Sequence, residues 1–272
     1  MKPKLNLKPQ LHFAHGNGFP SPCYRQMLMS LEAKFDCCFI DRIGHAKAFP
    51  IEDNWHTLVD ELIDSVRRQS NQPVVAVGHS LGGVLSVLAA LKEPALFRAV
   101  VLLDAPLLGH VRARAVQLSK KFGLIDKITP AYRTRTRRTH WQSRDAVRQY
   151  FKRRALFKQF DDACLNDYID YGMTHDETGY TLRFDANIEY QIYRTLPHTF
   201  QAYPTKLEVP AALIYGTNSD VIHASDRRYM RRHYGIQSFE TPGSHMFPLE
   251  HPKATAALIL KTLKQISINY LY

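Results

Sequence analysis

The sequence predicts an α/β protein in which helices cover a mostly parallel central sheet. Three observations predict this class. Short apolar runs alternate with amphipathic stretches, a glycine-rich turn joins one buried run to a helix, and the alternation resumes after a long interruption. The chain has 272 residues, of which 45% are hydrophobic and 22% are charged. This ordinary globular balance excludes wholesale disorder, collagen and coiled coil, and the length suffices for a core without disulfides.

The first part of the alternation predicts four strands. Residues 73–78 (PVVAVG) are rich in β-branched side chains, as expected of a strand that is buried on both faces. Asn54 is placed to cap a helix on which Leu58 and Leu62 share one face. The expected strands are 11–15, 37–41, 73–78 and 99–104, and the expected helices are 22–34, 54–68 and 82–92.

The alternation stops at about residue 107 and resumes near residue 206. Between these points helical stretches dominate and no buried-strand pattern occurs. We therefore expect a core formed by 1–106 and 206–272, and we call residues 107–205 the insert. After the insert we expect strands at 211–216 and 236–240 and helices at 224–234 and from Pro252 onward.

The positive charge is concentrated in the insert. The whole chain carries +11, whereas residues 112–158 alone carry +13, which leaves −2 for the remainder. Within this segment Ser143 is expected to cap a helix to about Phe160, with Arg144, Arg148 and Lys152 on one solvated basic face. Contact with an anionic surface or an acidic substrate is an alternative, whereas no nucleic-acid module matches, so we do not expect nucleic acid as a partner.

The cysteines and histidines indicate neither a metal site nor a disulfide framework. No Cys-x-x-Cys or paired-histidine spacing occurs, so we expect no metal and no cofactor. No apolar run approaches the ~20 residues that span a bilayer, and no secretory leader stands out. We therefore expect a cytoplasmic protein with reduced thiols at Cys23, Cys37, Cys38 and Cys164.

The most informative segment is residues 78–82 (GHSLG), which lie between a β-branched strand and a helix rich in small residues. A Gly-x-Ser-x-Gly sequence in this context is typical of a nucleophile elbow, a turn that exposes a serine hydroxyl. Gly78 and Gly82 are needed where strand and helix pass closely, and the helix N-terminus favours an oxyanion beside Ser80.

On these residues the chain resembles the α/β-hydrolase family, and GHSLGG is similar to the corresponding sequence of its esterase and lipase members. The resemblance implies the α/β-hydrolase fold with a mostly parallel sheet, in which the first strands of the family's eight are missing or very short here. It also implies that the insert, 107–205, is a helical lid over the active site.

The resemblance implies a triad in the order serine, acid, histidine. Asp220, in the loop after 211–216, occupies the family's acid position, and Asp104, at the end of an earlier strand, is the alternative. His245, between the last strand and the last helix, matches the family's base, whereas His251 is expected at the surface.

Residues 11–20 (LHFAHGNGFP) resemble the family's oxyanion segment. The backbone N–H groups of Asn17 and Leu81 are then expected to hold the oxyanion, with Gly18 as the alternative to Asn17. His15 is expected to brace this loop, and His79 is expected to be a packing residue of the elbow.

The resemblance implies a serine hydrolase that cleaves a small hydrophobic carboxylic ester through an acyl-enzyme. Thioester, lactone, amide and carbon–carbon substrates remain open, as does a non-catalytic binding or surface-docking protein on the same scaffold. The pocket is expected to be mainly apolar. Its candidate lining residues are Phe19, Leu107, Met246 and Phe247.

Overall fold

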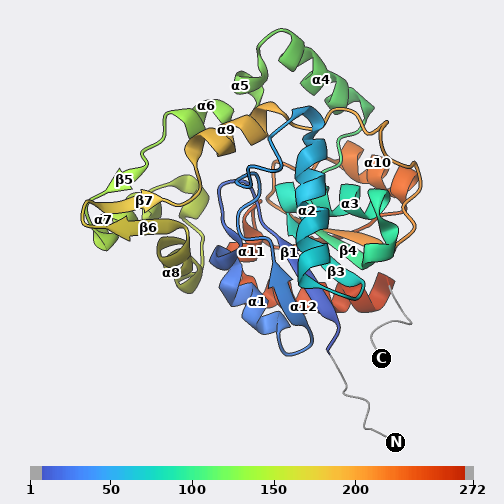
Figure 1. Ribbon diagram of the computed structural model, residues 1–272, viewed down its shortest axis with the longest axis horizontal. Coiled ribbons are helices and arrows are strands. Elements are labelled where there is room, and N and C mark those ends of the chain that lie inside the picture. Colours follow the sequence, from blue (N-terminus) through green and yellow to red (C-terminus); the bar gives the residue numbers. More distant parts are fainter. Residues whose placement is uncertain (1–7, 267–272) are drawn as a thin grey trace, which may run out of the picture.

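The computed structural model describes residues 8–266 and shows a six-stranded sheet with helices on both faces (Figure 1). All five strand pairs are parallel, and the strand order is β2-β1-β3-β4-β8-β9. The first and last residue of each strand lie within two residues of the predicted bounds. Within residues 8–266 this sheet has six strands. The strands are β1 (Gln10–Ala14), β2 (Asp36–Phe39), β3 (Val74–His79), β4 (Phe97–Leu103), β8 (Ala211–Gly216) and β9 (Gln237–Thr241).

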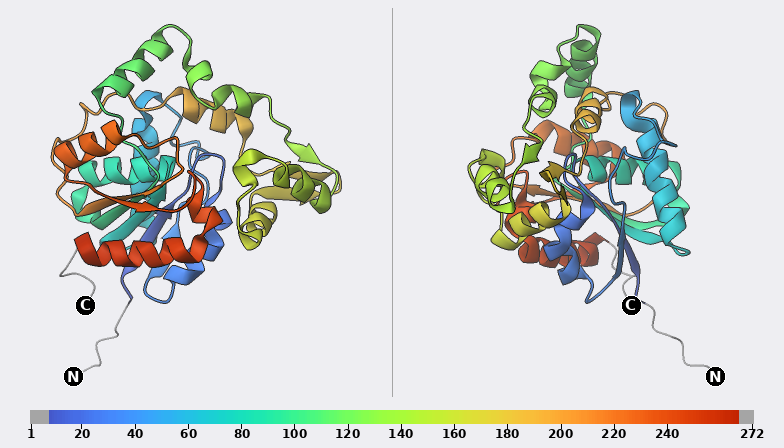
Figure 2. Two further views of the ribbon diagram at one scale, coloured as in Figure 1. Left: turned by 180° about the vertical axis from the view of Figure 1, so that it is seen from behind. Right: turned by 60° about the vertical axis from the view of Figure 1, so that its left-hand side comes forward.

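Alternate side chains of the central strands enter two separate apolar cores. On β3, Val75 and Val77 lie in one core, and Val74 and Ala76 lie in the other. Helices α2 and α3 cover one face in Figure 1, and α1 and α12 cover the opposite face, seen from behind in Figure 2. The core helices are α1 (Arg25–Leu31), α2 (His56–Gln69), α3 (Leu81–Lys92), α10 (Ala224–Tyr234), α11 (Phe247–Glu250) and α12 (Pro252–Ile266).

Two local predictions in the core are wrong in detail. Asn54 does not cap α2, because its backbone is left-handed (φ 62°) and its side-chain oxygen accepts hydrogen bonds from the backbone N–H groups of His198 and Thr199. The expected helix 22–34 begins instead as a 3-10 turn (Ser21–Tyr24) and continues as α1, which ends at Leu31. Asn54 thus links the core to the end of the insert.

The insert contains a small antiparallel sheet, β5-β7-β6, which the sequence did not predict. Its strands have only two to four residues, which is too few to show a buried-strand pattern in the sequence. Ser143 caps α7 as expected, but the helix ends at Lys152 rather than near Phe160. The elements are α4 (His110–Lys121), α5 (Ile125–Ile128), α6 (Ala131–Arg135), β5 (His140–Trp141), α7 (Arg144–Lys152), α8 (Asp162–Tyr171), β6 (Met173–Asp176), β7 (Gly179–Leu182) and α9 (Ala186–Arg194).

The insert arches along one rim of the core (Figure 1). Its aromatic side chains share a hydrophobic cluster with the sheet and with Phe19. The rings of Phe157 and Tyr168 lie 5.7 and 5.2 Å from that of Phe19. In residues 8–266 we find no helix that combines the length and apolarity needed to cross a bilayer.

Candidate catalytic site

Ser80 lies at a sharp turn between β3 and α3, with backbone angles of φ 50° and ψ −113°. A side chain at Gly78 would place its Cβ 2.3 Å from the backbone of Gly82, and one at Gly82 would lie 2.1 Å from the carbonyl oxygen of Ala14. Both positions therefore require glycine. Ser80 is partly exposed although the flanking strand and helix are buried, so this turn presents the hydroxyl.

The acid that contacts His245 is Asp104, not Asp220. His245 Nδ1 lies 2.7 Å from Oδ2 of Asp104, which is fully buried at the end of β4. Asp104 is close to the elbow, because the backbone N–H of Ser80 donates to the carbonyl of Leu103 at 2.9 Å. The structure therefore brings Ser80, Asp104 and His245 to the carboxyl edge of β3, β4 and β9.

The Asp104 carboxylate is surrounded by donors. The backbone N–H of Gly216 donates to its Oδ1 at 2.9 Å, and the hydroxyl of Ser219 donates to its Oδ2. A buried carboxylate is tolerated when such partners satisfy it. Asp220 is exposed, and no hydrogen bond or ion pair of its side chain occurs within residues 8–266. The loop after β8 thus supports the acid through Ser219 instead of supplying it.

His79 connects three loops of the site. The backbone N–H of Gly16 donates to the Tyr24 hydroxyl at 3.3 Å, so Tyr24 is free to donate its own proton to His79 Nδ1 at 2.7 Å. His79 Nε2 then donates to the carbonyl of His245 at 2.9 Å. Burial lowers the pKa of His79 well below its usual value, which keeps the ring neutral. His79 therefore fixes the backbone beside the base, beyond the packing role expected of it.

No direct hydrogen bond joins the nucleophile Ser80 to the base His245. Within residues 8–266 neither Ser80 Oγ nor His245 Nε2 has a hydrogen-bond partner. The rings of His79 and His245 are 4.9 Å apart, which places the base beside the residue that precedes Ser80. In enzymes without bound substrate such bonds are often long and form in the substrate complex.

The expected oxyanion segment lies against the start of α3. The backbone N–H of Gly82 donates to the carbonyl of His15 at 3.1 Å. His15 braces the loop as expected, because its Nε2 accepts a hydrogen bond from the backbone of Ile43, and burial lowers its pKa to about 4. Within residues 8–266 no group accepts a hydrogen bond from the backbone N–H of Asn17, Gly18 or Leu81. Either Asn17 or Gly18 can therefore act with Leu81.

A charged pair from the insert covers the oxyanion segment, which the sequence did not predict. The Glu189 carboxylate lies so close to Gly18 that a Cβ there would be 2.8 Å from Oε1, and its backbone carbonyl accepts from the side chain of Asn17. Arg137 lies 2.6 Å from Glu189, yet burial still raises the pKa of Glu189 to about 6. The four expected lining residues are all buried in the two apolar cores, whereas Glu189 and Arg137 place charged groups beside Gly18. The four lining residues are Phe19, Leu107, Met246 and Phe247.

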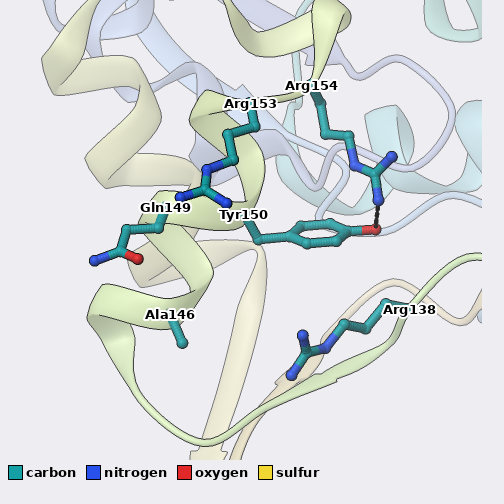
Figure 3. A pocket seen from close by; sticks show the side chains of 6 residues that line it. All are labelled: Arg138, Ala146, Gln149, Tyr150, Arg153 and Arg154. Carbon is teal, nitrogen blue, oxygen red and sulfur yellow. Dashed lines mark hydrogen bonds between the residues drawn. The ribbon is translucent and has the colours of Figure 1, made fainter.

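A separate hollow of about 500 Å³ lies on the outer side of α7 (Figure 3). Arg138, Arg153 and Arg154 line it, together with Tyr150. The guanidinium of Arg154 lies over the Tyr150 ring, 4.3 Å from its centroid, and donates to the Tyr150 hydroxyl at 2.7 Å. None of the elbow residues lines this hollow. Nowhere in residues 8–266 do three or more His, Cys, Asp or Glu side chains form a group able to hold a metal ion.

Several known proteins are similar to this chain in sequence or in fold. A 2-(acetamidomethylene)succinate hydrolase from Mesorhizobium japonicum is 31% identical over 98 residues, a match that spans 35% of each chain. A probable alcohol acetyltransferase from Cyberlindnera fabianii is 22% identical over 97% of this chain and 75% of its own. The crystal structure of an E-2-(acetamidomethylene)succinate hydrolase superposes with a TM-score of 0.73 at 19% identity, covering 96% of this chain and 92% of the other. The alpha/beta hydrolase family matches residues 13–258, and the chain therefore belongs to that family.

Proposed function

We propose that this alpha/beta hydrolase is a serine hydrolase that cleaves a carboxylic ester through an acyl-enzyme, with Ser80 as nucleophile, His245 as base and Asp104 as acid. The contact between His245 Nδ1 and Asp104, made beside a strained and partly exposed serine, carries the proposal. A binding protein has no need of a buried carboxylate aligned with a histidine at a nucleophile elbow.

Each group has one role in the proposed reaction. The Nδ1–H of His245 donates a hydrogen bond to Asp104, which leaves Nε2 free to accept the proton of Ser80 as its oxygen attacks the carbonyl carbon. Asp104 then stabilises the imidazolium, and the N–H groups of Leu81 and of Asn17 or Gly18 stabilise the oxyanion. His245 returns the proton to the leaving alcohol. Water activated by the same imidazole next releases the acid and restores Ser80.

The insert is proposed to act as the lid of this site. Its aromatic side chains pack on Phe19, and Glu189 lies against Gly18, so it covers the segment that holds the oxyanion. Thioester, lactone, amide and carbon–carbon substrates use the same first step. The alcohol acetyltransferase relative, which aligns with 97% of this chain, favours acyl transfer to an alcohol as a second candidate.

The test combines a fluorophosphonate probe with p-nitrophenyl esters of graded acyl length, assayed on the wild type, Ser80→Ala and Ser30→Ala. Ser30 is a partly buried serine of α1, outside the site, and serves as the matched control. We expect Ser80→Ala to abolish labelling and to lower ester turnover by about 10⁴-fold or more, with Ser30→Ala unchanged.

The outcomes separate the parts of this proposal. Full labelling of Ser80→Ala would place the nucleophile elsewhere. Labelling of the wild type without turnover of any ester would contradict ester hydrolysis while retaining the serine. Adding an alcohol and measuring the new ester tests the second candidate, since only a transferase converts most of the acyl-enzyme to that product.

A further inference from the structure

Exposed apolar side chains are concentrated at one end of the insert. Six of the large hydrophobic residues exposed in the described chain lie within residues 111–132, and the other three are scattered. Val111 is 84% exposed and Phe122 is 66% exposed, far more than a covered core residue. A contiguous exposed patch marks a contact surface more often than isolated residues do. We call these six the apolar patch: Val111, Leu118, Phe122, Leu124, Ile128 and Tyr132.

The patch begins as a stripe along the outer face of α4. Val111 and Leu118 are seven residues apart and so share one face of the helix, and Phe122 follows four residues later at its end. A different side of the helix contributes the buried residues Val116 and Ser119. One side of helix α4 is therefore packed against the protein, whereas another side presents exposed apolar residues.

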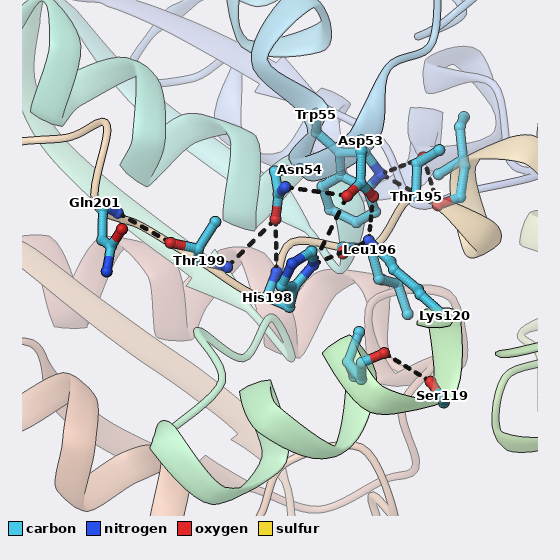
Figure 4. Close-up of polar contacts among 12 residues, drawn as sticks. Asp53, Asn54, Trp55, Ser119, Lys120, Thr195, Leu196, His198, Thr199 and Gln201 are labelled. Atoms are coloured by element: carbon cyan, nitrogen blue, oxygen red, sulfur yellow. Dashed lines mark hydrogen bonds and ion pairs between the residues drawn. The ribbon is translucent and has the colours of Figure 1, made fainter. Parts of the chain in front are cut away.

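Polar contacts fix the orientation of α4. On the inner face Lys120 forms an ion pair with Asp53, donates to the carbonyl of Leu196 at 2.6 Å and contacts His198 Nδ1 at 3.1 Å (Figure 4). Near the other end of the helix Arg112 pairs with the fully buried Asp226. Rotating α4 to bury its apolar stripe would break these contacts. They therefore hold the helix with the stripe facing outward.

Unneutralised cations border the apolar patch. Arg114 and Lys121 on α4, Lys127 on α5 and Arg133 on α6 are exposed, and within residues 8–266 no carboxylate lies within 4.0 Å of any of them. This differs from α7, where Arg144 pairs with a carboxylate of α8. An anionic partner would therefore complement this end of the insert.

Helix α4 lies at the outer margin of the molecule in all three views (Figures 1 and 2). A flat surface can thus approach it without meeting the central sheet. Apolar side chains flanked by Lys and Arg on a surface helix are the pattern of interfacial binding to anionic lipid. A second copy of this chain is a poorer partner, because residues 112–158 carry +13 and two such ends would repel each other.

We propose that α4 and α5 dock this hydrolase on an anionic membrane surface, with the apolar patch entering the headgroup region and Arg114, Lys121 and Lys127 contacting lipid phosphates. The inference stands apart from the catalytic proposal, because docking requires neither Ser80 nor a particular substrate.

The experiment is co-sedimentation of the full chain with phosphatidylcholine vesicles, with and without phosphatidylglycerol. We expect binding to the phosphatidylglycerol vesicles that weakens as salt rises. Leu118→Gln with Phe122→Gln should lower the partition coefficient by about tenfold or more, since each side chain loses the free energy of apolar transfer. Arg114→Gln with Lys121→Gln should lower it by roughly thirtyfold, at about 1 kcal/mol per cation.

The matched control is Met29→Gln with Leu156→Gln, which replaces two exposed apolar residues outside the patch and should bind as the wild type does. Turnover of a short soluble ester and the Tm of each variant report that the fold is kept. Absence of binding at low salt would overturn the proposal. Equal binding by all variants, or a dimer on size exclusion that Phe122→Gln dissociates, would overturn it as well.

Discussion

The carboxyl edge of the central sheet and the insert are held by different kinds of interaction. At the sheet edge, buried neutral hydrogen bonds join Gly16, Tyr24, His79 and the backbone of His245. In the insert, many of the polar contacts are partly exposed ion pairs, such as Arg144 with Asp170. Buried networks leave unpaired groups when one member is removed, whereas exposed pairs are replaced by water. Removing one polar partner should therefore matter greatly at the sheet edge and little at the exposed ion pairs of the insert.

The largest contrast is between two aspartates. Asp104→Asn should lower kcat of the hydrolysis by about 10³–10⁴-fold, because the amide favours the wrong tautomer of His245. Asp220→Asn should change kcat by less than about threefold, because this side chain is exposed. Steady-state kinetics on one ester measures both. A large loss in Asp220→Asn with none in Asp104→Asn would restore Asp220 as the acid.

Glu61 provides the next largest effect, on stability. Its carboxylate on α2 accepts from the backbone of Gly44 at 2.7 Å, and burial raises its pKa to about 7. The folded state therefore favours the protonated form. Its stabilising contribution is complete below the ordinary pKa near 4.5 and is lost as the pH rises through about 7.

Glu61→Gln removes this dependence because the amide stays neutral. The free energy of unfolding of the variant, relative to the wild type, should therefore increase between about pH 5 and pH 8 by on the order of 3 kcal/mol. Urea unfolding at both pH values gives this difference. A constant gap would show that the carboxylate is not the titrating group.

Tyr24→Phe tests the network that positions the base. Loss of the hydroxyl leaves His79 Nδ1 and the backbone N–H of Gly16 without partners. We expect kcat to fall by about tenfold with KM nearly unchanged, since Tyr24 is fully buried and acts through His79. Tyr171→Phe, at an exposed position, is the control. A rise in KM alone would instead indicate a role in substrate binding.

The smallest effect is expected in the insert. Arg144→Gln breaks a pair whose side chains are both more than 40% exposed, so the free energy of unfolding should fall by less than about 1 kcal/mol. The difference should disappear at ~1 M salt, because the Debye length is then about 3 Å. A loss that persists in high salt would mean that the insert depends on its ion pairs as the sheet edge depends on its hydrogen bonds.

The strands and the elbow could be predicted because their signals are local. Residues 73–82 combine a β-branched run with two glycines, and the clash that Gly78 avoids is with Gly82, a neighbour in sequence. The antiparallel sheet of the insert escaped prediction because strands such as His140–Trp141, with two residues, are too short to show a pattern. Asn54 misled the helix prediction because its partners, His198 and Thr199, lie far along the chain.

The sequence by itself determined that β3, the turn at Ser80 and α3 form a strained elbow, because the sterics of residues 78–82 allow little else. Only the tertiary structure decided that His245 meets Asp104. Both aspartates follow strands of one sheet, and the choice depends on which carboxylate is enclosed by donors from β8 and its loop. Packing likewise decided which face of α4 turns outward, since the inner partners of Lys120 are distant in sequence.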